Sequence, residues 1–181
     1  ANQMNHVILQ VPLPQDTLWL ECTNPSLPFG YVHQDIAGHD ALLIEPDGGK
    51  MYRLPTYPDS LNTQHIAADI TLSPTAEARI EVNEVSRIFQ YENEAGIVYL
   101  EPNQQKDRIR SGIHLPQADI RNLQISECKE ANPSITFRYT ATSNQYGHKT
   151  GNRLFIPANV FRKEFSVPPL TKRMYPIHID Y

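Results

Sequence analysis

The feature that most restricts the fold of this sequence is a pair of short runs of alternating or β-branched side chains, one on each side of a proline-rich turn at residues 12–16. Such a pattern predicts a β-hairpin near the start of the chain. If the turn is centred on Leu13 and Pro14, His6 and Glu21 face each other across the two strands. Directly opposed side chains have Cβ atoms about 4.5–5.5 Å apart. The imidazole and the carboxylate are therefore expected to form a hydrogen bond.

Alternation along the two strands assigns their side chains to two faces. Ile8 and Trp19 fall on the same face as His6 and Glu21, so the indole is expected to lie beside this pair. The opposite face is wholly apolar and is expected to pack into the core; it comprises Val7, Leu9, Val11, Leu18, Leu20 and Cys22. Because a slip of one residue would disrupt both faces, the register should be well specified.

A histidine held by a carboxylate is an arrangement suited to proton transfer. The carboxylate accepts one ring N–H, which fixes the tautomer and stabilises the imidazolium, and the other ring nitrogen can then take a proton from a nucleophile. The same spacing also occurs in cross-strand ion pairs without a catalytic role, which are worth only about 0.2–1 kcal/mol. The residues alone leave both alternatives open.

Two motifs in this hairpin resemble part of a known superfamily: His-Val-Ile at residues 6–8 and Trp-Leu-Glu-Cys-Thr at residues 19–23. They resemble the second half of a transglutaminase-like catalytic core. In that superfamily the catalytic residues follow the chain order Cys, His, Asp, with the His and Asp on neighbouring strands. Pro-Phe-Gly at residues 28–30 and the run at residues 151–159 resemble bacterial secreted or periplasmic proteins of unknown function, in which β-rich domains flank such a core.

The resemblance implies a cysteine-dependent peptidase or amidase that acts on peptide or protein substrates. His6 would be the general base and then the acid for the leaving amine, and Glu21 would orient His6. Trp19 would wall the substrate-binding site and exclude water. The acid here is Glu21 instead of the usual aspartate, so its carboxylate reaches one methylene further.

The nucleophilic cysteine that this resemblance requires does not precede His6 in the sequence. Cys22 falls on the opposite face of the hairpin and is expected to be a core thiol. Cys128 has no histidine near it in the sequence and is expected to be a packed, unreactive thiol. We therefore expect a fragment that is inactive alone and whose partner is a missing N-terminal lobe, before Ala1, that carries the cysteine.

A second interpretation comes from a different functional class. The chain would be a non-catalytic β-rich binding or interaction module of a bacterial extracytoplasmic protein, in which His6 and Glu21 are relics. An exposed apolar patch centred on Ile8 and Trp19 would favour the first interpretation, because it would indicate a further lobe packing there. Both interpretations predict a periplasmic or secreted location.

The rest of the sequence predicts a mainly β fold. Fifteen of the 181 residues are proline, above the usual ~5%, and they separate short apolar stretches. Apolar side chains alternate with polar ones at residues 66–72, 78–82 and 135–141, which favours an antiparallel sandwich-like arrangement. One short surface helix is expected at residues 101–110, where Pro102 stands near the start.

Two domains are expected from these patterns. Residues 1–60 would be the C-terminal part of a transglutaminase-like core, an α+β remnant with the end of its sheet, and residues 61–181 a β-sandwich-like trailing domain. The formal net charge is −4 with scattered basic residues, so no nucleic-acid partner is expected. No apolar run approaches the roughly 20 residues of a membrane-spanning helix, so no membrane span is expected either.

A second polar cluster places two imidazoles and two carboxylates within eight residues: His33, Asp35, His39 and Asp40. These residue types can bind zinc or a similar ion. Their spacing is not helical, however, and Gly38 loosens the segment. The cluster is better interpreted as a polar loop that follows the second strand of the hairpin and rims the cleft, so neither a metal nor another cofactor is expected.

Overall fold

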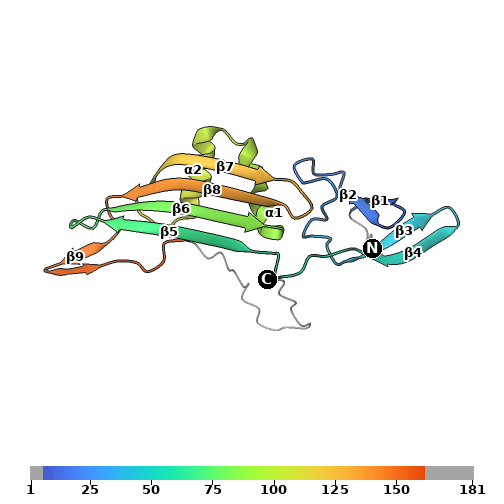
Figure 1. Cartoon of the computed structure of the whole chain (residues 1–181), viewed down its shortest axis with the longest axis horizontal. Coiled ribbons are helices and arrows are strands. Elements are labelled where there is room, and N and C mark those ends of the chain that lie inside the picture. Colours follow the sequence, from blue (N-terminus) through green and yellow to red (C-terminus); the bar gives the residue numbers. More distant parts are fainter. Residues whose placement is uncertain (1–5, 162–181) are drawn as a thin grey trace. The chain divides into compact units, whose positions relative to one another are not determined.

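A computed structural model describes residues 6–161, and it is mainly β, as the sequence predicts (Figure 1). The strands form four sheets with the orders β1-β2, β3-β4, β5-β6-β8-β7 and β10-β9. The strands are β1 (Leu9–Pro12), β2 (Thr17–Leu20), β3 (Asp40–Glu45), β4 (Gly48–Arg53), β5 (Gln64–Leu72), β6 (Ala78–Arg87), β7 (Asp119–Cys128), β8 (Ser134–Ser143), β9 (His148–Thr150) and β10 (Arg153–Phe155). The helices are α1 (Phe89–Ala95), the 3-10 helix η1 (Gly96–Tyr99) and α2 (Pro102–Ser111). Among residues 6–161, no helix has the length and apolar character needed to cross a bilayer.

The described chain divides into two compact units. The first contains residues 6–65, 85–96 and 126–136, and the second contains residues 66–84, 97–125 and 137–161. The expected division was into residues 1–60 and 61–181. In the described chain, α1 and the connection between β7 and β8 also belong to the first unit. Residues 162–181 of the expected trailing domain lie outside the described residues.

The hairpin formed by β1 and β2 is present, but its register differs from the expected one. The pairs Gln10–Trp19 and Val11–Leu18 place the turn between Pro14 and Gln15, one position beyond the expected centre. The backbone N–H of Leu13 closes this turn by donating to the carbonyl oxygen of Asp16 at 2.8 Å. Moving the turn by one position changes the pairing by two residues, so each side chain stays on its expected face.

The prediction of which face of this hairpin packs into the core was wrong. Trp19 is buried at 8% exposure in a cluster with Val32 and Leu54, and Ile8 packs against this cluster. On the opposite face, Val7 and Leu9 are 77% and 53% exposed, and Cys22 is also exposed. The reason is that the segment after β2 and the end of β4 cover the indole. An exposed patch centred on Ile8 and Trp19 is therefore not present.

A second hairpin is formed by β3 and β4, and the short helix expected at residues 101–110 is confirmed. Strands β3 and β4 pair antiparallel from Asp40–Arg53 to Glu45–Gly48. Helix α2 begins at Pro102, whose missing N–H is not needed in the first turn. The backbone N–H of Glu101 donates to the Gln104 side chain at 3.1 Å and completes a capping box.

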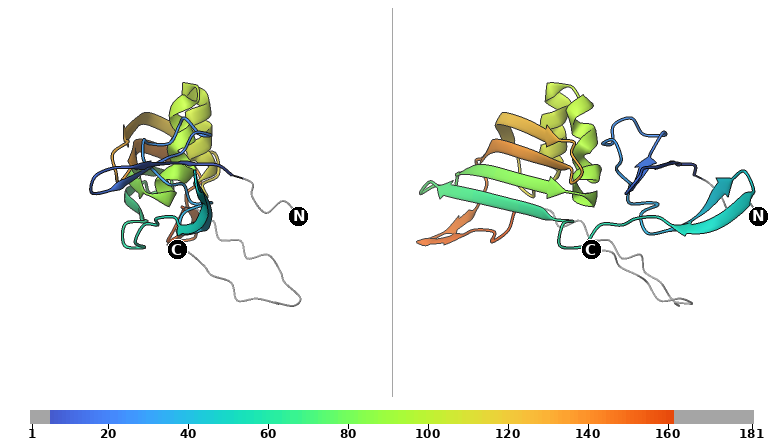
Figure 2. Two further views of the ribbon diagram at one scale, coloured as in Figure 1. Left: turned by 90° about the vertical axis from the view of Figure 1, so that its right-hand side faces the viewer. Right: turned by 45° about the vertical axis from the view of Figure 1, so that its right-hand side comes forward.

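The four-stranded sheet contains one strand, β7, that the alternation did not predict. Neighbouring strands of this sheet run side by side in Figure 1 and in the right-hand view of Figure 2. In β7, Ile120 is buried, and the partly buried positions then continue at Leu123 and Ile125. Asn122 has a positive φ of 53°, which shifts the alternation by one residue as a β-bulge does. This break conceals the period of two in the sequence.

Gly30 adopts a conformation that L side chains rarely occupy, and its replacement by alanine is expected to destabilise the first unit. Its φ is +77°, and an added Cβ would lie 2.9 Å from Leu18 Cδ1. We expect Gly30→Ala to lower the free energy of unfolding by about 1–3 kcal/mol, which urea denaturation would measure. Gly38→Ala, with φ +68° and only ordinary contacts, separates the backbone strain from the contact with Leu18. If Gly30→Ala is as stable as Gly96→Ala, which has open space and a helical φ, the described loop conformation is wrong.

Candidate functional site

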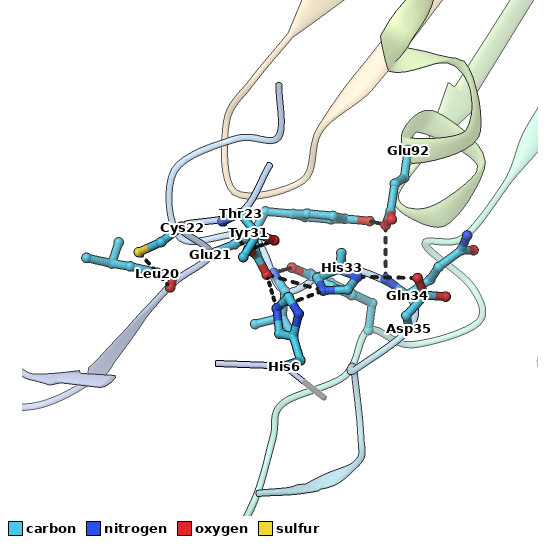
Figure 3. Close-up of polar contacts among 12 residues, drawn as sticks. His6, Leu20, Glu21, Cys22, Thr23, Tyr31, His33, Gln34, Asp35 and Glu92 are labelled. Atoms are coloured by element: carbon cyan, nitrogen blue, oxygen red, sulfur yellow. Dashed lines mark hydrogen bonds and ion pairs between the residues drawn. The ribbon is translucent and has the colours of Figure 1, made fainter. Parts of the chain in front are cut away.

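Three side chains from the first unit converge at one point (Figure 3). His6 precedes β1, Glu21 directly follows β2, and His33 lies in the segment between β2 and β3. His6 Nε2 is 2.6 Å from Glu21 Oε2, so the hydrogen bond expected from the sequence is present. The pair forms even though His6 lies outside the strand, because the chain before β1 brings the imidazole back toward the end of β2.

His33 joins this pair, which the sequence analysis did not predict. Its Nε2 is 3.2 Å from the same Glu21 Oε2 and 3.4 Å from His6 Nε2. The two imidazole rings meet edge to face, with centroids 5.0 Å apart and planes inclined by 69°. We call His6, Glu21 and His33 the His–Glu–His cluster. All three side chains are largely buried, with exposures of 21%, 2% and 13% respectively.

Glu21 is held in one orientation by Thr23. The backbone N–H and the hydroxyl of Thr23 both donate to Glu21 Oε1, at 2.6 and 2.5 Å. Burial by itself raises the pKa of Glu21, but the hydrogen bonds from Thr23 and from His6 outweigh it and lower the pKa to about 2. Glu21 is therefore ionised at neutral pH, and Oε2 is the oxygen that remains for the imidazoles.

The segment that carries His33 is anchored to helix α1. Glu92 Oε2 accepts hydrogen bonds from the Tyr31 hydroxyl and from the Gln34 backbone N–H, both at 3.0 Å. The Tyr57 hydroxyl accepts the backbone N–H of Val32 at 3.1 Å. Burial, together with the neighbouring Glu92 carboxylate, raises the pKa of Tyr31, so its hydroxyl remains a donor. These contacts fix the backbone on both sides of His33.

The cluster borders an open hollow of about 300 Å³ in the first unit. The residues around it are mostly polar: His6, Thr23, Asn24, Leu27, His33, Asp35 and Glu92. Trp19, expected to wall the site, is not among them; its ring packs against Tyr52 with centroids 5.1 Å apart. The role of Trp19 in substrate binding remains a prediction.

The two cysteines do not complete a catalytic triad with His6. Cys22 and Cys128 are both free and exposed, so the expectation that both thiols are packed was wrong. Cys22 Sγ lies 3.7 Å from the Leu20 carbonyl oxygen and points away from the two imidazoles (Figure 3).

Of the second polar cluster in the sequence, only part reaches this site. His33 enters it, and Asp35 Oδ2 lies 3.9 Å from His33 Nδ1. Asp40 pairs instead with Arg53 at 3.1 Å across β3 and β4. The expected polar loop is therefore correct for residues 33–35. The sequence contained a signal for His33 as a polar loop residue, but none for its pairing with Glu21.

Comparison of this chain with protein-family models, with curated proteins and with solved structures finds no match. The geometry of the site and the residues that compose it are therefore what indicate its function.

Proposed function

We propose that His6 and Glu21 are the proton-transfer pair of a transglutaminase-like, cysteine-dependent hydrolase of peptide or amide bonds. The observation that supports this proposal most is the 2.6 Å bond from His6 Nε2 to a buried, ionised carboxylate. That bond orients the ring, and Thr23 in turn orients the carboxylate. Among residues 6–161, no hydrogen-bond partner is assigned to His6 Nδ1, so this nitrogen is the one that can act as a base.

The proposed reaction uses His6 twice. Nδ1 first accepts the proton of a cysteine thiol, and the thiolate sulfur bonds to the amide carbonyl carbon. The C–N bond then breaks as Nδ1 returns the proton to the leaving amine, which produces a thioester. Water attacks the thioester carbon and gives its proton to His6, and the released thiol recovers a proton. Glu21 stabilises the imidazolium that forms in both halves of the reaction.

In this proposal the thiol belongs to a polypeptide segment outside residues 1–181. Cys22 points away from His6, and Cys128 is on the described β7 without a bond to the cluster. A peptide or protein substrate and a bacterial extracytoplasmic location also remain part of the proposal.

The source of the thiol can be tested on the full-length polypeptide that contains this chain. Intact mass and N-terminal sequencing would first identify the cysteine-bearing segment, and hydrolysis of fluorescein-labelled casein would measure activity. We expect iodoacetamide to abolish this activity, and we expect the double variant Cys22→Ser/Cys128→Ser to retain it. Loss of activity in Cys22→Ser alone would overturn the assignment of the nucleophile to another segment. Undiminished activity after complete alkylation would exclude cysteine chemistry.

A further inference from the structure

We propose that the His–Glu–His cluster binds a divalent transition-metal ion such as Zn²⁺. Its ligands would be His6 Nε2, His33 Nε2 and one carboxylate oxygen of Glu21. The site goes beyond the proposed function. An ion bound there would occupy Nε2 of His6, the proposed base, and would therefore inhibit the proposed proton transfer. Metal binding itself does not depend on that function.

The positions of the three donor atoms suit one small cation. Zinc binds nitrogen and oxygen ligands at about 2.0–2.2 Å, which places the ligand atoms of a tetrahedral site roughly 3.3–3.5 Å apart. The separation of the two Nε2 atoms is 3.4 Å, and that of His33 Nε2 from Glu21 Oε2 is 3.2 Å. The third edge, from His6 Nε2 to Glu21 Oε2, is 2.6 Å. It would have to lengthen by less than 1 Å to admit the ion.

Hydrogen bonding alone is a poor explanation for this convergence. If each Nε2 carries a proton, both N–H groups can donate to Glu21 Oε2, but they then face each other across 3.4 Å. If one Nε2 is unprotonated, it can accept a long hydrogen bond from the other ring at 3.4 Å, but its lone pair then also faces the carboxylate oxygen. A cation at the common point removes both conflicts, because all three atoms then present lone pairs to it.

The surroundings also resemble those of a metal site. A ligating carboxylate is normally held by hydrogen bonds, and a ligating histidine normally has a carboxylate or carbonyl near its other ring nitrogen. Thr23 holds Glu21 Oε1 with two hydrogen bonds. Asp35 lies on the Nδ1 side of His33 at 3.9 Å. The anchor of Gln34 on Glu92 limits the movement of the His33 backbone.

The donor set indicates which ions fit. Two imidazoles and one carboxylate suit Zn²⁺, Co²⁺, Ni²⁺ or Fe²⁺, whereas Ca²⁺ and Mg²⁺ prefer six or more oxygen ligands. Three protein ligands leave a fourth position for water or another ligand. The cluster borders the open hollow, so this fourth ligand can be supplied from solvent.

The test is a titration of the chain with ZnCl₂ by isothermal calorimetry after treatment with EDTA, accompanied by the absorption spectrum of the Co²⁺ complex. We expect one saturable site per chain, tetrahedral-type cobalt bands, and no competition from Mg²⁺. His33→Ala should weaken zinc binding by about 100-fold or more, since loss of an outer-shell partner alone typically weakens it 10–100-fold. His65→Ala, a control in the same unit, should bind like the wild type.

A folding defect in His33→Ala would be detected by circular dichroism, and His33→Cys provides a second variant. The thiolate is also a zinc ligand, so His33→Cys should bind zinc with at least tenfold higher affinity than His33→Ala and should shift the cobalt spectrum toward thiolate coordination. Absence of saturable binding in the wild-type chain, or equal zinc affinity in His33→Ala and the wild type, would overturn the proposal. No substrate is present in these titrations, so a failure of metal binding is distinguishable from a failure of the proposed hydrolase.

Discussion

Replacement of His6 by alanine is expected to lower the rate of amide-bond hydrolysis by the full-length polypeptide about 10²–10⁴-fold, the range associated with loss of a general acid–base group. His6 is the imidazole that would deprotonate the thiol and protonate the leaving amine. In the variant both transfers would have to use water. The measurement is the turnover of labelled casein in the presence of EDTA, which keeps bound metal from obscuring the result.

The loss in His6→Ala can be separated from a loss of structure. His6 precedes β1, so its removal should leave the circular dichroism spectrum nearly unchanged, and the loss of a hydrogen-bond partner of the buried Glu21 should lower the unfolding midpoint without abolishing the cooperative transition. Added imidazole should restore part of the activity by occupying the space of the missing ring. His65→Ala should retain full activity. Wild-type turnover by His6→Ala would exclude the proposed proton-transfer pair.

Glu21→Gln is expected to change how folding stability depends on pH. The pKa of Glu21 is about 2 in the folded chain, against an ordinary value of 4.5. A lowered folded-state pKa stabilises the fold fully above the unfolded-state pKa and loses that contribution as the pH falls through the folded-state pKa. The wild-type chain should therefore lose stability between about pH 4.5 and pH 2 through this group. The lost contribution is on the order of 2–3 kcal/mol.

The difference in unfolding free energy between wild type and Glu21→Gln, measured by urea denaturation in EDTA from pH 2 to pH 7, isolates this contribution. It should be largest at neutral pH and should shrink toward pH 2, where Glu21 begins to be protonated. Glu45→Gln is a matched control, since Glu45 pairs with Lys50 at 2.8 Å through side chains that are exposed to solvent. A pH-independent difference for Glu21→Gln would mean that the carboxylate does not have a lowered pKa.

The hairpin and its histidine–carboxylate pair could be predicted from local sequence alone. Proline-rich turns and alternation act over a few residues, and they identify which side chains share a face. The register was expected to be well specified with the turn centred on Leu13 and Pro14, and this expectation was wrong by one position. The described chain places the centre between Pro14 and Gln15, with Gln10 opposite Trp19. The bond from His6 to Glu21 survives because the chain before β1 is not bound to strand geometry.

The identity of the core face could not be predicted from the hairpin itself. Both of its faces carry apolar side chains, so the outcome depends on which face later segments cover. Val32 and Leu54, which are 13 and 35 residues beyond Trp19 in the sequence, cover the indole. On the opposite face, Val7 and Leu9 are exposed and Leu18 and Leu20 are only half-buried. Alternation contains no information about that choice.

The third member of the cluster depends on contacts at longer range. His33 reaches Glu21 because its segment is bound to Glu92, which lies 58 residues after Gln34. Neither helix α1 nor its role as an anchor was predicted, since α1 begins after Ile88 without a side-chain cap. A pattern based on neighbouring residues can identify His33 as a polar loop residue at a cleft, but it cannot predict the contact between His33 and His6.

Whether His6 activates a thiol can be measured by the pH dependence of alkylation of the full-length polypeptide by iodoacetamide. Mass spectrometry would follow the rate at each cysteine. A thiol paired with an imidazole is ionised well below the usual pKa of about 8.5. We therefore expect one cysteine outside residues 1–181 to react rapidly at pH 6 and to lose this reactivity in His6→Ala. If every cysteine instead reacts with an ordinary thiol profile in both proteins, His6 does not activate a thiol and the proposed function is contradicted.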